Sequence, residues 1–351
     1  MVRILLDARP LGDGRHGIAR YILSMAPVFA AESGLEWTVV CAPRWSGWFR
    51  SLGMRTVDTS LRFTSPLAPF ALALIQREVR PDVTFCPSFV PAFPSRGPLV
   101  MTLHDMTHLA RPSDFSPLVQ IYYRLLTLPA ARRSAAVIAV SDYTRHELER
   151  RGGLRNVVTI HAGVAHEQFS PDGPRDLRIG PRTILYVGGY KPHKRVELLV
   201  DALADVPGAT LALVGDVPGA LLERAAGRGV RDRLLILGTL TDPELAAAYR
   251  SATVFAFPST LEGFGSPPVE AMASGTPVVV TNGTSLAEIV ADAGVRFDGG
   301  AEQLAAALRR LLDDPAECDR LRALGLRRAA SFSYEEAARA TIAVLRAAAN
   351  P

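Results

Sequence analysis

The fold is decided by one stretch, Phe257-Pro-Ser-Thr-Leu-Glu262-Gly-Phe-Gly-Ser-Pro-Pro-Val-Glu270-Ala-Met-Ala-Ser-Gly275-Thr-Pro-Val-Val-Val280. The apolar run Thr253 to Phe257 leads into it and predicts a buried strand. Pro267 and Pro268 suit the first turn of a helix, where a missing N–H costs little, and Gly275 is typical just past a helix end. A second apolar run, Pro277 to Val280, predicts the next strand and hence a parallel α/β sheet.

Two glutamates flank the expected start of this helix. Glu262 lies in the glycine-rich loop Leu261 to Ser266, and Glu270 is expected in the first helical turn. N–H groups at a helix N-terminus attract anions, so a carboxylate there needs another purpose, such as hydrogen bonding to sugar hydroxyls. The alternative is that Glu270 only complements the helix dipole and Glu262 is solvated.

The pattern F-P-S-x-x-E-G-F-G-x-P-x-x-E-A-M-A-x-G-x-P-V-V resembles the retaining GT-B glycosyltransferases of the sucrose-synthase-like family 4. The resemblance implies an α/β fold of two Rossmann-like domains, each with a doubly wound parallel sheet, that face each other across a cleft. It implies that Glu262 contacts the donor sugar and Glu270 the ribose of the nucleotide. The donor-binding loop would then comprise Gly263, Phe264, Gly265 and Ser266.

Length and composition agree with two domains. The chain has 351 residues, of which 48% are hydrophobic and 21% charged, enough for sizeable cores. Cys41, Cys86 and Cys318 lie far apart and are expected as buried free thiols in a reducing cytoplasm. No N-terminal signal is expected, and no apolar run has the length of a membrane span. We therefore expect a cytoplasmic protein.

A linker is expected at the Pro- and Gly-rich segment Phe169 to Pro174. This predicts an N-terminal acceptor-side domain over residues 1–172 and a C-terminal nucleotide-sugar-binding domain over residues 173–332. The resemblance implies that a last helix, about 333–351, packs back on the first domain.

The glycines Gly12, Gly14 and Gly17 follow the first expected strand and precede a helix, as in a dinucleotide-binding fingerprint. The second strand, Trp37 to Ala42, lacks the acidic residue that would hold an adenosine ribose. His16 to Tyr21 resembles the family's G-G-I-G-R-Y loop, which implies that Gly17 lets the backbone approach the donor. The alternatives are a structural turn, an NAD(P)-dependent oxidoreductase, and an inverting GT-B enzyme that uses His16 or Asp13 as its base.

Two of the three tryptophans lie among four arginines in the segment Arg44 to Arg62. This fits an acceptor-binding patch or a peripheral contact at the inner face of the plasma membrane, and equally a loop packed on the N-terminal core. The net charge of +4 is compatible with an anionic donor, a phospholipid surface or nucleic acid. We expect no nucleic-acid partner.

His104 follows the expected strand Leu99 to Leu103, at the edge of a parallel sheet where ligands bind. Met101 to Asp105 resembles the family's V-x-T-x-H-D element, which implies that His104 borders the donor's anomeric region. His108 has no such position and is expected on the surface.

In the second half, Lys194 stands between a strand and a helix, where it could meet a diphosphate. The resemblance implies that role, and Gly188 and Gly189 belong to the same loop. Gly189 stands where many members have an arginine, and Lys191, His193 or Arg195 could replace that cation. The resemblance also places the base contact at Gly238 to Leu240, and Asp242 is expected to cap the next helix.

The resemblance implies a nucleotide-sugar donor, a saccharide, glycolipid or small-molecule acceptor, and retained anomeric configuration. Glu262, His104 and Lys194 are the expected catalytic residues. No Asp-x-Asp occurs in the chain, so neither a metal nor another cofactor is expected. No carboxylate in the N-terminal half is an evident nucleophile, which favours a front-face substitution. GDP-mannose is the favoured donor, with UDP- and dTDP-sugars as alternatives.

Overall fold

The chain divides into two compact units. The computed structural model describes residues 1–14, 16–112 and 116–350. Unit 1 comprises Met1–Gly163 and Tyr334–Pro351, and unit 2 comprises Val164–Ser333. Arg15, inside the Gly12 to Gly17 loop, and Pro351, at the end of the expected last helix, lie outside the described residues.

The boundary between the units lies nine residues before the one expected at 172/173. Phe169 is buried and packs edge-on against Tyr249 of unit 2, with 5.8 Å between ring centroids. Val164 and Ser333 form a parallel bridge, so the two chain segments that leave unit 2 start side by side. The Pro- and Gly-rich run is therefore part of unit 2 and not a free linker.

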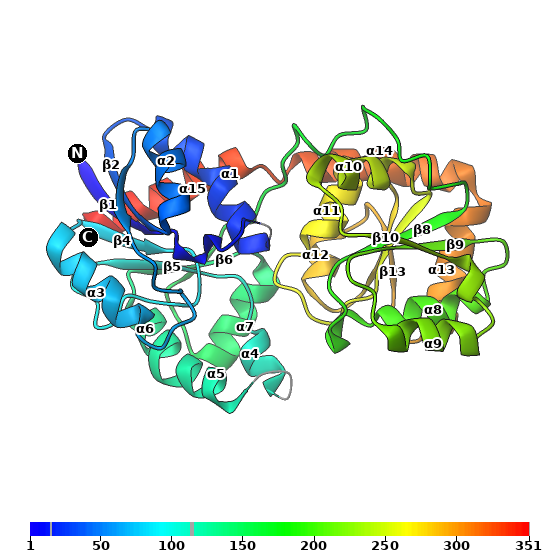
Figure 1. The fold of residues 1–351 in the computed structure, drawn as a ribbon, viewed down its shortest axis with the longest axis horizontal. Coiled ribbons are helices and arrows are strands. Elements are labelled where there is room, and N and C mark those ends of the chain that lie inside the picture. The colour runs from blue at the N-terminus through cyan, green and yellow to red at the C-terminus, as the bar shows by residue number, and fades with distance from the viewer. Residues whose placement is uncertain (15, 113–115, 351) are drawn as a thin grey trace. The chain divides into compact units, whose positions relative to one another are not determined.

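Unit 1 is built on a seven-stranded parallel sheet of order β3-β2-β1-β4-β5-β6-β7 (Figure 1). Every residue of β4, β5 and β6 is buried, which explains why the central strands are continuous apolar runs. Its strands are β1 (Val2–Asp7), β2 (Leu35–Cys41), β3 (Arg55–Asp58), β4 (Val83–Cys86), β5 (Leu99–Leu103), β6 (Ala136–Ala139) and β7 (Val157–Thr159).

Helices cover both faces of this sheet. They are α1 (Gly17–Ala31), α2 (Pro43–Ser51), α3 (Ala68–Val79), α4 (Thr107–Ala110), α5 (Pro117–Tyr122), α6 (Leu128–Arg133), α7 (Asp142–Gly152) and α15 (Tyr334–Ala349), with a 3-10 turn at Arg9–Leu11 and a π-helical turn at Tyr123–Thr127. The C-terminal α15 packs against α1 and contacts β4 and β5, and Arg346 pairs with Glu32 at 2.7 Å (Figure 1).

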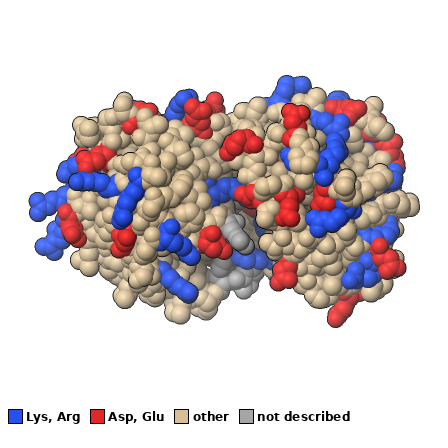
Figure 2. Space-filling view, turned by 45° about the horizontal axis from the view of Figure 1, so that its top comes forward, with Lys and Arg blue, Asp and Glu red and all other residues tan. Residues whose placement is uncertain are grey.

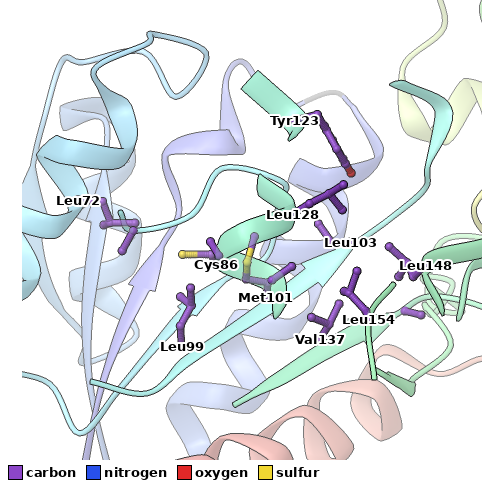
Figure 3. Packing of buried hydrophobic residues seen from close by; sticks show 14 of the residues in the cluster. Leu72, Cys86, Leu99, Met101, Leu103, Tyr123, Leu128, Val137, Leu148 and Leu154 are labelled. Carbon is purple, nitrogen blue, oxygen red and sulfur yellow. The ribbon is translucent and has the colours of Figure 1, made fainter. Parts of the chain in front are cut away.

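The core of unit 1 joins one sheet face to three helices (Figure 3). Leu72 of α3, Leu128 of α6 and Leu148 of α7 belong to the same buried cluster as Met101 of β5. Cys86 lies in this cluster, and burial raises the pKa of its thiol. All three cysteines are buried and free, as predicted.

Unit 2 contains a six-stranded parallel sheet of order β10-β9-β8-β11-β12-β13 (Figure 1). Its strands are β8 (Thr183–Val187), β9 (Thr210–Val214), β10 (Leu234–Gly238), β11 (Val254–Phe257), β12 (Val278–Thr281) and β13 (Val295–Phe297). Its helices are α8 (Val196–Ala204), α9 (Gly219–Gly227), α10 (Asp242–Ser251), α11 (Ser266–Ala273), α12 (Ser285–Val290), α13 (Ala301–Asp313) and α14 (Pro315–Ala330). The cap of α10 is Thr241, in a capping box with Glu244, and not Asp242 as expected.

The segment Arg44 to Arg62 forms α2 and the edge strand β3, and is not a loop. Phe49 is fully buried, Trp48 packs edge-on against it, and the indole N–H of Trp45 donates to the Gly12 carbonyl at 3.2 Å. The aromatic side chains are thus used in packing, and all four arginines of the segment are exposed.

Candidate functional site

Lys194 and Glu262 form an ion pair at the carboxyl edge of the unit 2 sheet. Lys194 follows β8 and Glu262 follows the neighbouring strand β11, and Nζ lies 2.6 Å from Oε1. The two side chains are 19% and 13% exposed, so ligands can reach them although water access is reduced. The ammonium also lies 5.1 Å from the ring centroid of Phe257.

The two loops that carry this pair are hydrogen-bonded together. The carbonyl of His193 accepts from the backbone N–H of Thr260 at 2.8 Å and from the hydroxyls of Ser259 and Thr260 at 3.3 and 3.2 Å. Ser285, at the start of α12, donates its hydroxyl to the carbonyl of Glu262 at 2.9 Å. These contacts hold the ion pair in place. Sequence reasoning missed Ser285, because its partner is a backbone carbonyl 23 residues away.

Gly265 allows the sharp entry into α11. Its φ is +96°, and a Cβ there would lie 2.4 Å from Cδ2 of the buried Leu286. Pro267 and Pro268 occupy the first turn, as predicted. They remove two backbone donors, so Ser266 and Val269 provide the remaining first-turn N–H groups for an anion.

Gly265→Ala is expected to lower the free energy of unfolding by about 1–3 kcal/mol, because it combines a left-handed backbone with a clash in a packed site. Urea denaturation measures this. Gly219→Ala is the matched control, because Gly219 begins α9 and a Cβ there meets no atom within 4 Å. The control should be neutral or stabilised by up to about 1 kcal/mol. Equal stabilities of the two variants would contradict the assigned strain.

Glu270 lies in the second turn of α11, not in the first turn as expected, because the helix begins at Ser266. Its side chain is nearly buried, and Oε2 accepts the hydroxyl of Tyr249 at 2.9 Å. Tyr249 of α10 is a second residue that sequence reasoning left out of the site. Its hydroxyl partner depends on how α10 packs on α11, which no local sequence pattern contains.

Tyr249→Phe removes only the hydroxyl that donates to Glu270. We expect the free energy of unfolding to fall by about 1–3 kcal/mol, because the nearly buried carboxyl group of Glu270 loses a hydrogen bond. Urea denaturation measures it. Tyr190→Phe is the control, because that hydroxyl donates at 3.2 Å to a neutral carbonyl, of Val214, and should cost only about 0.5–1.5 kcal/mol. A loss for Tyr249→Phe no greater than that of the control would contradict the argument.

The glycines expected at the donor site lie at the carboxyl ends of β8 and β10. Gly188 has φ +151°, and the next carbonyl, of Gly189, accepts the hydroxyl of Tyr186 at 2.6 Å. Gly238 has φ +70° and its carbonyl accepts the N–H of Gly215 at 2.8 Å. A Cβ at Gly189 or Gly238 would meet no atom within 4 Å. Open space therefore lies in front of both backbones.

Leu240 lies half-buried just beyond β10. Of the three candidates to replace the cation missing at Gly189, His193 is buried. Arg195 donates to the carbonyl of Gly299 at 3.3 Å, and Lys191 is exposed.

In unit 1, His104 directly follows β5, at the carboxyl edge of that sheet, as predicted. Its Nε2 lies 3.1 Å from the Pro87 carbonyl, and its ring packs edge-on against Tyr21 at 5.0 Å. Burial lowers the pKa of His104 below its ordinary value, so the ring is neutral at pH 7 and donates Nε2–H to Pro87.

Gly17 begins α1, and a Cβ at this position would meet no atom within 4 Å. The preceding His16 caps the helix, since its Nδ1 accepts the N–H of Ala19 at 3.3 Å. His108 is not a surface residue as expected: its ring is half-buried and stacks on Tyr123 with 5.2 Å between centroids.

Basic and acidic side chains are interspersed over the face drawn in Figure 2, unlike the continuous basic footprint of a nucleic-acid-binding protein. Among the described residues, no helix combines the length and the apolar character that crossing a bilayer requires.

Comparison with known proteins agrees with this architecture. The sequence profile of Glycosyltransferase Family 4 matches residues 15–168, and that of Glycosyl transferases group 1 matches residues 174–327. The chain has the fold of the Anabaena protein HepE in its complex with UDP and glucose, with a TM-score of 0.79, 21% identity, and coverage of 99% of this chain and 100% of HepE. Two parallel-sheet units with helices on both faces match the GT-B fold.

Curated relatives lead to the same family. O-antigen chain mannosyltransferase B of Escherichia coli is 31% identical over 266 residues, which are 69% of this chain and 68% of the relative. MMP alpha-(1->4)-mannosyltransferase of Mycolicibacterium hassiacum is 32% identical over 268 residues, 70% of this chain and 64% of the relative. The chain belongs to the group 1, family 4-like GT-B glycosyltransferases. Nothing in these matches supports the oxidoreductase alternative.

Proposed function

We propose that this glycosyltransferase moves a hexose from a nucleoside diphosphate sugar to an acceptor hydroxyl with retention of anomeric configuration, and that the hexose is mannose. The observation that carries the proposal is the Lys194–Glu262 ion pair at the ligand edge of the unit 2 sheet. The donor class is supported by HepE, whose structures contain UDP or UDP-glucose. Mannose is supported by the two mannosyltransferase relatives.

The ion pair suits both parts of the donor, the diphosphate and the sugar. Glycosidic cleavage leaves a diphosphate, so negative charge develops on the leaving group and must be stabilised. An ammonium has three N–H donors, so Lys194 can bond a phosphate oxygen while it still holds Glu262 at 2.6 Å. The N–H groups at the start of α11 add to this. Glu262 then accepts hydrogen bonds from sugar hydroxyls and orients the ring.

Retention follows from a front-face substitution in which the departing phosphate oxygen accepts the proton of the acceptor hydroxyl. Lys194 supplies the cationic charge that a metal would otherwise supply, so transfer should survive a chelator. The roles of Gly17 and His104 toward the sugar, and of Gly238 to Leu240 and Glu270 toward the nucleoside, stay predictions from the family resemblance.

A donor screen tests the proposal. Hydrolysis and transfer are measured with GDP-mannose, UDP-glucose, dTDP-glucose and ADP-glucose, each with and without EDTA, and the product anomer is assigned by NMR. We expect turnover of GDP-mannose to exceed that of the other sugars, to persist in EDTA, and to give the α-anomer of the α-linked donor. An inverted anomer would refute retention, and preference for another donor would refute the assignment of mannose.

A further inference from the structure

A cavity of 460 Å³ lies within unit 1, beyond the carboxyl ends of β1, β2 and β3. Its walls are Arg9 and Gly12 after β1, Ala42 and Arg44 after β2, and residues 59–64 after β3. Small-molecule sites have volumes of roughly 300–1,000 Å³, and parallel sheets bind ligands outside the carboxyl ends of their strands. The cavity thus has the size and place of a ligand site, and all its lining residues belong to unit 1.

One wall of the cavity is a fixed guanidinium. Arg9 donates to both carboxylate oxygens of Asp7, at 2.7 and 2.8 Å, and from Nη1 to the carbonyl of Ala68 at 2.8 Å. Both members of this pair are buried, with side chains that are 2% and 0% exposed. Their charges cancel, so Arg9 gives the wall rigidity and further N–H donors without a net charge.

Two other arginines of the lining keep their charge. Arg44 and Arg62 are exposed and make no ion pair within the described part of the chain. By contrast Arg55, in the same segment, pairs with Glu36 at 2.8 Å. The lining includes no carboxylate among the described residues. The cavity therefore carries a net charge of about +2.

The rest of the lining combines polar and apolar groups. Ser60 and Thr64 bring hydroxyl groups, while Leu61 and Phe63 are half-buried. The hydroxyl of Thr59 accepts a hydrogen bond from the N–H of Leu61 at 3.2 Å, which stabilises the turn after β3. Such a lining suits an anionic head attached to a less polar body.

We propose that this cavity binds a phosphate group carried by the acceptor. The proposal deepens the proposed function, since it assumes that an acceptor binds to unit 1. A phosphate monoester carries about −1.5 to −2 at pH 7, which matches the charge of Arg44 and Arg62. Guanidinium groups bind phosphate oxygens in a bidentate manner. A neutral saccharide would leave both charges without a partner. The phosphate belongs either to a soluble sugar phosphate or to a lipid headgroup.

Phosphate binding by charge-reduced variants tests the proposal. Arg44→Gln/Arg62→Gln is compared with the native chain and with Arg77→Gln/Arg133→Gln, which removes two exposed arginines of unit 1 outside the cavity. Calorimetry uses inorganic phosphate, mannose 6-phosphate and mannose. Sedimentation uses phosphatidylcholine vesicles with and without phosphatidic acid. GDP binding is measured in parallel on all three proteins.

We expect the cavity variant to lose about 10- to 100-fold in affinity for the phosphate probes, while the control variant and GDP binding are unchanged. If only mannose 6-phosphate binds, the acceptor is a soluble sugar phosphate. If only the phosphatidic acid vesicles bind, the phosphate belongs to a lipid. Either outcome supports the proposal. It is overturned if no phosphate probe binds the native chain, if the cavity variant keeps its affinity, or if it loses GDP binding. Failure of GDP to bind the native chain would count against the donor assignment instead.

Discussion

Glu262→Gln is expected to lower kcat/KM for sugar transfer by about 10²–10³-fold. The substitution keeps the size of the side chain and one acceptor oxygen, but it removes the charge that pairs with Lys194 at 2.6 Å. Charge-assisted hydrogen bonds to the sugar become neutral ones of roughly half the strength. Initial-rate kinetics with the preferred donor measure the loss.

The matched control is Glu302→Gln, at the exposed first turn of α13 in the same unit. It should leave kcat/KM unchanged. The free energy of unfolding of Glu262→Gln should change by no more than about 1 kcal/mol, because the ion pair is partly accessible to solvent. A Glu262→Gln protein that turns over at the native rate would remove Glu262 from the mechanism.

Lys194→Gln is expected to lower kcat/KM by about 10²–10³-fold through loss of charge at the leaving group. It should also weaken binding of the nucleoside diphosphate product by about 10- to 100-fold, because an ammonium–phosphate contact is lost. Product inhibition measures the second effect, which Glu262→Gln should not show to the same degree. Unchanged product inhibition would contradict the role assigned to Lys194.

Two further variants sharpen this result. Arg231→Gln removes an exposed positive charge elsewhere in unit 2 and should behave as the native chain. In the Lys194→Gln/Glu262→Gln protein, the loss in kcat/KM should be well below the product of the single losses, because the two groups act as a unit. Fully multiplicative losses would show that they act independently.

Much of the fold could be predicted from local pattern. The strand before Pro258, the helix that starts near Pro267 and the stop at Gly275 are confirmed. Such features depend on hydrophobic periodicity and on the backbone preferences of Pro and Gly, which act over a few residues. The N-cap of α10 shows the limit of this reasoning. The box formed by Thr241 and Glu244 is a local signal, but the capping preference of the neighbouring Asp242 predicts the wrong residue.

The errors share a different cause. The unit boundary was misplaced because the burial of Phe169 against Tyr249 depends on packing and not on the Pro and Gly content of the run. His108 was expected on the surface, yet it stacks on Tyr123 of a separate helical turn. In both cases the packing partner lies outside the short stretch of sequence around the residue. The local sequence pattern therefore does not predict the contact.

The sequence alone determined the family and the order of the strands along the chain, and it predicts Lys194 and Glu262 as site residues. Those properties lie in motifs whose residues are neighbours. Only the tertiary structure decided that Lys194 and Glu262 contact each other, 68 residues apart, and that Glu270 is buried beneath Tyr249. It also decided which arginines of the Arg44 to Arg62 segment remain unpaired at a cavity. These contacts depend on which strands become neighbours in each sheet. The pairing of strands that are distant in sequence is fixed by the packing of the whole core.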